Sequence, residues 1–295
     1  MELERKFQDN ISSHKESKQE KILLEQMVDM ETAEKYQAKT KYYRAVIVGA
    51  VAVAIVLGGY SYLFAELAGQ QYRFENPGTF NSGYVIQNLK GDTIDTFLSW
   101  NLISGNVLYV KIVNAEKYSE EHIEAIKQAI LSETKIDIDQ SLLGKGPRGE
   151  TLEYYLGWRG ALLAASAEPT LLYIPTNFEI IESGEAQGDI VIELVNEKNG
   201  DGLTGWSVSI ADDEVNQILK SRITLFEVDR LSPEQLGTIL RHEFGHSIGL
   251  AHSTAQEDLM YPTIQTNYPY VSKCDIDAIS DLYDGGRISA VICEE

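Results

Sequence analysis

The hydrophobic pattern of the chain changes sharply at residues 45–65, which read AVIVGAVAVAIVLGGYSYLFA and contain no charged residue. At a rise of 1.5 Å per residue, a helix of about 20 residues spans the roughly 30 Å hydrocarbon core of a bilayer. A buried core helix is the alternative, but core helices seldom stay uncharged over such a length. The pattern therefore predicts a single transmembrane helix at 45–65.

Basic residues lie close to only one end of this run. Lys39, Lys41 and Arg44 precede it, whereas the next basic residue after it is Arg73. The positive-inside rule then places the N-terminus in the cytoplasm and the rest of the chain outside. Because 44 residues precede the run, we expect a retained signal anchor in the cell membrane and not a cleaved signal peptide.

The anchor divides the chain into four predicted segments. Residues 1–44 form a cytoplasmic helical segment, 45–65 the anchor, 66–100 a polar extracytoplasmic stalk with several turn formers, and 101–295 the folded domain. Leu23, Met27 and Met30 make a short apolar stripe in the first segment, which covers less than the three or four heptads of a coiled coil. A solvated helix is the simpler interpretation, and oligomerisation through 1–65 is a further hypothesis.

The folded domain mixes both kinds of periodicity and is therefore expected to be α+β. Helices are predicted from Ser119 to about residue 133, at 150–167 and from Ser232 onward. Strands are predicted at 106–113, 170–181, 189–195, 205–210 and 223–228.

Charge separates the segments further and excludes one class of partner. The chain has 45 acidic and 25 basic side chains, a formal net charge of -20, and 43% hydrophobic residues. Residues 1–44 hold nine of each sign, so the whole negative excess lies beyond them. Phosphate binding needs clustered lysine and arginine, and we therefore expect no nucleic-acid partner.

The helix that begins at Ser232 carries the candidate chemistry. Ser232 and Gln235 have the spacing of a capping box with a proline in the first turn. An apolar stripe follows at Leu236, Leu240, Phe244 and Ile248. At about 100° per residue, the two histidines of the helix fall on a face roughly 160° away from that stripe. The helix is therefore expected to bury one side while both imidazoles face a cleft.

The histidines have the spacing of a zinc site. His242 and His246 are separated by one helical turn and can share one Zn²⁺, which prefers nitrogen ligands in tetrahedral geometry. Glu243 can reach a water on that ion and act as its general base. Gly249 can end the helix at positive φ and return His252 as third ligand. A set of unrelated histidines, or Glu257 as third ligand, are the alternatives.

At these residues the sequence resembles the metzincin metalloproteases, and among them the matrixins. The shared signature is His242-Glu243-x-x-His246-x-x-Gly249-x-x-His252.

Two later segments extend the resemblance. Leu259-Met260-Tyr261-Pro262 is similar to the matrixin Met-turn, in which the methionine supports the zinc site, and 271–283 is similar to the C-terminal helix of the family. The resemblance covers about 223–285. It implies a metzincin fold, with a twisted mixed β-sheet, an active-site helix and a small C-terminal subdomain. It also implies a substrate lying antiparallel to an edge strand, for which 205–210 is our candidate.

The sequence departs from matrixins in its cysteines and its metal-binding acids. Cys274 and Cys293 both follow the signature, which argues against latency through a propeptide cysteine. They could form one disulfide, pair between molecules or remain free thiols. Four acids, Asp189, Asp201, Asp212 and Asp213, could contribute to a Ca²⁺ site, although solvated surface acids are the simpler interpretation.

Together these patterns predict a membrane-anchored zinc endopeptidase that hydrolyses extracytoplasmic proteins or peptides. His242, His246 and His252 would bind Zn²⁺, Glu243 would be the catalytic base, and Met260 and Gly249 would support the site. The alternative is a catalytically inactive extracellular module for binding or adhesion, stabilised by zinc. Glu243 speaks against that alternative, because a structural zinc site has no use for a carboxylate beside an open coordination position.

Overall fold

The computed structural model describes residues 39, 49, 78–184, 187–264 and 269–293. The chain divides into two units, Met1–Gln71 and Tyr72–Glu295, and nearly all described residues belong to the second. The predictions for the cytoplasmic segment, the anchor and oligomerisation through 1–65 therefore lie outside the described residues. Among those that are described, no helix is long and apolar enough to cross a membrane.

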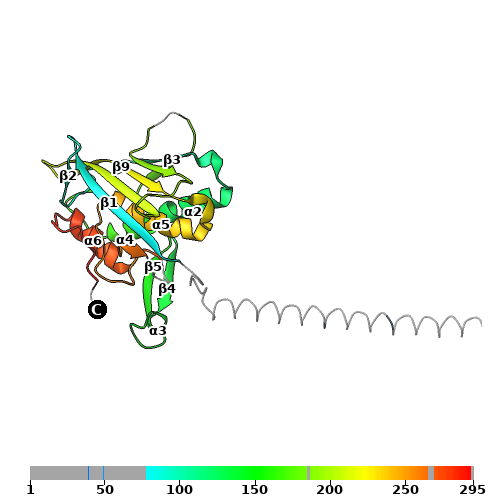
Figure 1. The fold of residues 1–295 in the computed structure, drawn as a ribbon. Coiled ribbons are helices and arrows are strands. Elements are labelled where there is room, and N and C mark those ends of the chain that lie inside the picture. Colours follow the sequence, from blue (N-terminus) through cyan, green and yellow to red (C-terminus); the bar gives the residue numbers. More distant parts are fainter. Residues whose placement is uncertain (1–38, 40–48, 50–77, 185–186, 265–268, 294–295) are drawn as a thin grey trace, which may run out of the picture. The chain divides into compact units, whose positions relative to one another are not determined.

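The second unit is built on one mixed sheet, which confirms the predicted α+β class (Figure 1). Its strands follow the order β10-β1-β8-β9-β7-β3-β6, and β2 pairs with β1 outside this path. The strands are β1 (Phe80–Asn88), β2 (Thr93–Ile94), β3 (Leu108–Val113), β6 (Phe178–Ile181), β7 (Ile190–Leu194), β8 (Gly205–Asp212), β9 (Gln217–Leu225) and β10 (Thr263–Ile264).

Strand direction changes once in the centre of this sheet. β6, β3, β7 and β9 are parallel neighbours, β8 is antiparallel to β9, and β1 is parallel to β8. A separate hairpin, β4 (Lys135–Asp139) with β5 (Thr151–Tyr155), encloses the short helix α3 (Gln140–Leu143). Because parallel strands are covered by connecting helices, the central strands β3, β7 and β9 bury most of their isoleucines and leucines.

The helices are α2 (Glu120–Leu131), α4 (Trp158–Ala165), α5 (Pro233–Ser247) and α6 (Lys273–Tyr283), with short 3₁₀ turns η1 (Ala115–Lys117) and η2 (Val228–Arg230). α5 packs against α2 on one side and against β8, β9 and β1 on another. Ser232 and Gln235 form the predicted capping box. α5 is buried on every face from Leu236 to Ser247, and not on one stripe alone, because α2, α4 and the sheet surround it.

Two predicted segments are wrong, and the strand predicted at 170–181 is shortened to β6. Residues 80–100, assigned to the stalk, belong to the domain: β1 is a strand of the main sheet, and Leu98 and Trp100 lie in the core. Residues 150–167 form a strand followed by a helix, and not one helix, because β5 pairs with β4 and Tyr155 also bridges to Val271. In both cases distant segments supply the hydrogen bonds.

The C-terminal residues close over the end of α5. Cys274 on α6 and Cys293 form a disulfide, which is one of the three outcomes that the sequence left open. Val291 bridges to Ser253, just after the predicted third histidine. The small C-terminal part is thereby fastened beside the histidines.

Candidate active site

α5 supplies two histidines whose orientation is fixed by backbone carbonyl groups. His242 and His246 are both buried. Their Nδ1 atoms lie 2.7 Å from the carbonyl oxygen of Leu259 and 2.8 Å from that of Leu250. Since a carbonyl can only accept, each Nδ1 carries the proton and each Nε2 presents a lone pair.

His252 reaches the same point from beyond the helix end. Gly249 has φ of 111°, and an added Cβ there would collide with the carbonyl oxygen of Leu98, so only glycine fits this turn. The turn brings one nitrogen from each of His242, His246 and His252 within 4.8 Å of the others. The prediction that Gly249 redirects the chain toward the histidines agrees with this geometry.

The three imidazoles fit a metal ion. The Nε2 atoms of His242 and His246 are 3.1 Å apart, although both carry lone pairs, and Nε2 of His252 is buried without a hydrogen-bond partner in the described part of the chain. A cation bound between the three nitrogens would satisfy this set. Three nitrogen ligands suit Zn²⁺ with a fourth position left for reaction.

Burial also keeps the imidazoles neutral. It lowers the pKa of His242 to about 3 and that of His252 to about 4. The pKa of His246 is lowered well below its usual value by burial and by the two neighbouring histidines. At neutral pH, protons therefore do not compete with a metal for these nitrogens.

Glu243 lies beside the histidines and is held by two serines. The Oγ atoms of Ser82 and Ser207 donate to its two carboxylate oxygens, each at 2.6 Å. Burial raises the pKa of Glu243 to about 8, and the two hydrogen bonds oppose that shift. The two hydrogen bonds thus orient the carboxylate, and its pKa lies close to the range in which a general base works at neutral pH.

Met260 packs against the α5 backbone below the histidines. Its side chain is fully buried, and Asp258 fixes the turn by accepting a hydrogen bond from the Met260 amide at 2.9 Å. An added Cβ at Gly245 would lie 2.7 Å from Cε of Met260 and 3.0 Å from Trp158. The methionine therefore lies against α5 at Gly245, the residue before His246.

Three residues of the site were not predicted: Ser82, Tyr84 and Ser207. The Tyr84 ring stacks on His246 at 4.3 Å between centroids, with 20° between the planes, and meets His252 edge-on at 5.0 Å. Turn formers around residue 80 concealed β1, although Tyr84-Val85-Ile86 is an aromatic and β-branched run typical of a strand. No local signal connects Ser207 with Glu243, since the contact depends on the packing of β8 against α5.

Some predicted roles do not match the geometry. Strand β8, which contains 205–210, is not an edge, because β1 covers one side and β9 the other. Glu257 forms an ion pair with Lys145 and is not grouped with the histidines. The four candidate calcium ligands, Asp189, Asp201, Asp212 and Asp213, form no cluster of potential metal ligands within the residues that the structure describes.

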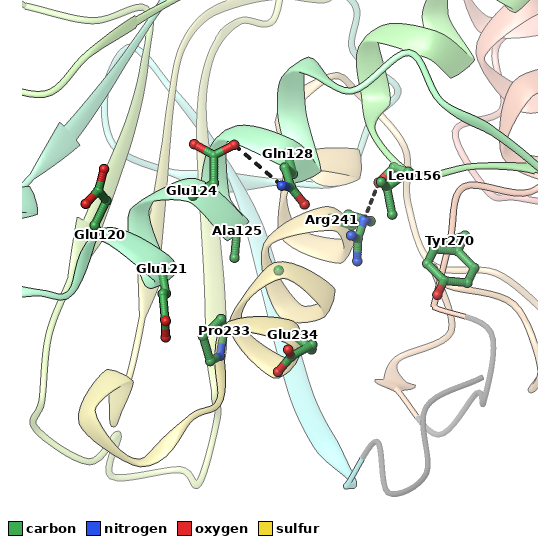
Figure 2. Close-up of a pocket in the computed structure, with 11 residues that line it drawn as sticks. Glu120, Glu121, Glu124, Ala125, Gln128, Leu156, Pro233, Glu234, Arg241 and Tyr270 are labelled. Atoms are coloured by element: carbon green, nitrogen blue, oxygen red, sulfur yellow. Dashed lines mark hydrogen bonds between the residues drawn. The ribbon is translucent and has the colours of Figure 1, made fainter. Parts of the chain in front are cut away.

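A separate hollow of about 620 Å³ lies between α2 and α5, away from the histidines (Figure 2). Glutamates from both helices line it, and Arg241 lies at its inner side. The Arg241 guanidinium donates to the carbonyl oxygens of Leu156 at 2.5 Å and Pro269 at 3.3 Å. Burial lowers the pKa of Arg241 to about 10, so it stays charged and ties α5 to two neighbouring segments.

The α+β domain thus contains a buried helix that brings two histidines and a glutamate to a third histidine, in an arrangement that could hold a metal ion. Residues 173–284 match the family model described as Matrixin. The chain contains a matrixin-like catalytic domain.

Several relatives agree with this family. Matrix metalloproteinase-20 from Homo sapiens is 35% identical over 127 residues, which are 39% of this chain and 26% of that protein. Stromelysin-1 from Rattus norvegicus is 32% identical over 120 residues, 37% of this chain and 25% of its own length. Matrix metalloproteinase-18 from Xenopus laevis is 50% identical over 48 residues, 15% of this chain and 10% of that protein. The chain spans about a quarter or less of the length of these relatives.

Proposed function

We propose that this protein is a zinc-dependent endopeptidase. The observation that carries the proposal is the convergence of three neutral imidazoles, two buried and one partly buried, beside a buried, hydrogen-bonded glutamate. His242, His246 and His252 would hold Zn²⁺. When bound, Zn²⁺ supplies Lewis acidity, which polarises a peptide carbonyl and makes water more acidic.

The chain's own residues would perform the proton transfers. Glu243 accepts the proton of the attacking water and returns it to the departing amine nitrogen, so one carboxylate serves both halves of the hydrolysis. Ser207 donates a hydrogen bond to Oε2 of Glu243. Ser82 donates to Oε1, so this oxygen becomes available for the proton transfer when the Ser82 hydroxyl has moved away. Met260 and Gly249 keep the histidines in place.

The setting of the activity is a further part of the proposal. The uncharged run at 45–65 and the basic residues before it support a single-pass anchor with the catalytic domain outside the cell. Protein or peptide substrates would then be extracytoplasmic. Protease treatment of intact cells tests the orientation: it should degrade the catalytic domain, and protection of that domain would reverse the orientation.

A zinc-stabilised adhesion module remains the competing function. It needs the three histidines but no general base. The two functions therefore differ in what Glu243 does, and substitution of this residue separates them.

The test measures zinc content and cleavage of a mixed peptide library by the full chain, in wild type, Glu243→Gln and Glu257→Gln. We expect one zinc per chain in all three proteins, chelator-sensitive cleavage by wild type, and a loss of about 10²- to 10⁴-fold in Glu243→Gln. Glu257→Gln, the same change at an exposed residue, should keep wild-type activity. If no zinc-loaded form of the protein cleaves any peptide of the library, the proposal is overturned in favour of the adhesion module.

A further inference from the structure

Strand β1 is held on both sides in the way that an extended peptide is held in a cleft. Along one side, residues from Ser82 to Asn88 pair with β8 in parallel register. At the start of the strand, Phe80 and Asn81 pair with β10 on the other side, and the Ser82 amide donates to the carbonyl oxygen of Pro262 at 3.3 Å. Main-chain hydrogen bonds of this kind bind peptides regardless of much of their sequence.

The side chains that β1 turns toward α5 meet the catalytic groups. Ser82 donates to Glu243, and Tyr84 lies against His246 and His252. The space that remains between Tyr84, Ser207 and His246 is about 10 Å³, which is at the limit for one water molecule. A substrate cannot reach Glu243 while β1 lies there.

The direction of β1 explains how it can stay uncut. β1 is parallel to β8, whereas the resemblance to matrixins implies that substrates bind antiparallel to this edge. Reversing the chain direction exchanges the positions of carbonyl carbon and amide nitrogen along the strand, and the two ladders have different hydrogen-bond patterns. A reversed peptide can therefore fill the cleft without presenting a bond correctly to Glu243.

We propose that β1 is an autoinhibitory segment, which lies along β8 beside Glu243 in the place that an extended substrate would need. The wild-type protein then has only the low activity of those molecules from which β1 has transiently left, and full activity requires the release of β1. This inference rests on the proposed function, and it assigns the latency to Ser82 and Tyr84 in a chain whose two cysteines are joined in a disulfide elsewhere. Without β1, β8 becomes the edge of the sheet and is free to pair with substrate.

Covalent attachment makes β1 a strong competitor. A tethered segment acts at an effective concentration in the millimolar range, so a dilute substrate displaces it poorly. The turn at 89–92 after β1 is exposed, as are most residues at 101–107. A cut in the turn at 89–92 would leave β1 on a separate N-terminal fragment, which can then dissociate from the rest of the domain.

The experiment compares full-length, zinc-loaded wild type with the double variant Ser82→Ala/Tyr84→Ala and with Gln87→Ala. Gln87 lies on the same strand, five residues after Ser82, and is the register partner of Ile210 on β8. We expect cleavage of the peptide library to rise at least 10-fold in the double variant and to stay unchanged in Gln87→Ala. A synthetic peptide of residues 78–90 should inhibit the double variant and remain intact by mass spectrometry, whereas a scrambled peptide should not inhibit.

A second route covers a double variant that fails to fold. A recognition site for a specific protease, inserted in the turn at 89–92, allows β1 to be released from an otherwise wild-type domain. Activity should rise after cutting and fall again when the 78–90 peptide is added. Equal cleavage by wild type, double variant and cut protein would overturn the latency and leave the endopeptidase standing. No cleavage by any zinc-loaded form would instead overturn the proposed function.

Discussion

Glu243 is positioned by Ser207, a residue 36 places earlier in the chain. Ser207 Oγ lies 2.6 Å from Oε2 of Glu243 and within 3.1 Å of its carbonyl oxygen. A hydrogen bond to the ionised carboxylate stabilises that form and lowers the pKa. Ser207 therefore acts on catalysis through Glu243 and is a positioning residue.

Replacement of Ser207 by alanine tests this role. We expect kcat/KM to fall about 10-fold, since a hydrogen bond to a charged group is lost. The pKa of Glu243 should rise, so the acidic limb of the pH profile of kcat/KM should move to higher pH.

Ser209→Ala is the matched control. Ser209 is buried on the same strand, and its hydroxyl lies 3.4 Å from that of Ser221. Its profile should keep the wild-type limb. An unmoved limb in Ser207→Ala would contradict the positioning role even if activity fell.

At the scale of the element, α5 depends on close approach to the Met260 turn. Gly245→Ala should lower the free energy of unfolding by about 1 to 3 kcal/mol, because the new methyl group meets Met260 and Trp158 in a packed core. Gly237→Ala, on the same helix, places its methyl group 3.5 Å from the nearest atom. This control should be neutral or more stable by up to about 1 kcal/mol, since alanine favours helix. Urea unfolding of both variants measures the difference, and equal stabilities would refute the close-packing argument.

For the whole molecule, a buried pair of carboxyl groups makes stability depend on pH. Asp258 and Asp275 both contact the hydroxyl of Ser272 below the Met260 turn. Burial and the charge of Asp258 hold the pKa of Asp275 well above its usual range. The folded state therefore keeps a proton that the unfolded state releases near pH 4, and stability falls as the pH rises from there toward the raised pKa.

Asp275→Asn should remove this dependence. Relative to wild type, the variant should gain up to about 1.4 kcal/mol of unfolding free energy per pH unit above pH 4, until the raised pKa is reached. The comparison of the two proteins cancels the contribution of the histidines, which has the opposite sign. Asp277→Asn, an exposed position on the same helix that pairs with Lys273, is the control. Parallel curves for wild type and Asp275→Asn between pH 5 and 8 would contradict the prediction.

The sequence by itself determined helix α5 and most of the three-histidine group at its C-terminal end. Ser232, Gln235, the histidine spacing and Gly249 act through bonds between residues close in the chain, and such bonds can be recognised without a fold. The same reason accounts for α2, which begins after its predicted cap Ser119.

Only the tertiary structure decided what surrounds those histidines. A strand takes its hydrogen bonds from a partner, and the partner of β1 lies more than 100 residues away: the Asn81 carbonyl accepts from Thr204, a separation of 123 residues. The contact of Ser82 with Glu243 spans 161 residues. The sequence therefore predicted a stalk at 80–88. In the structure this segment is a strand beside Glu243, because β8 supplies its main-chain hydrogen bonds and α5 packs against it.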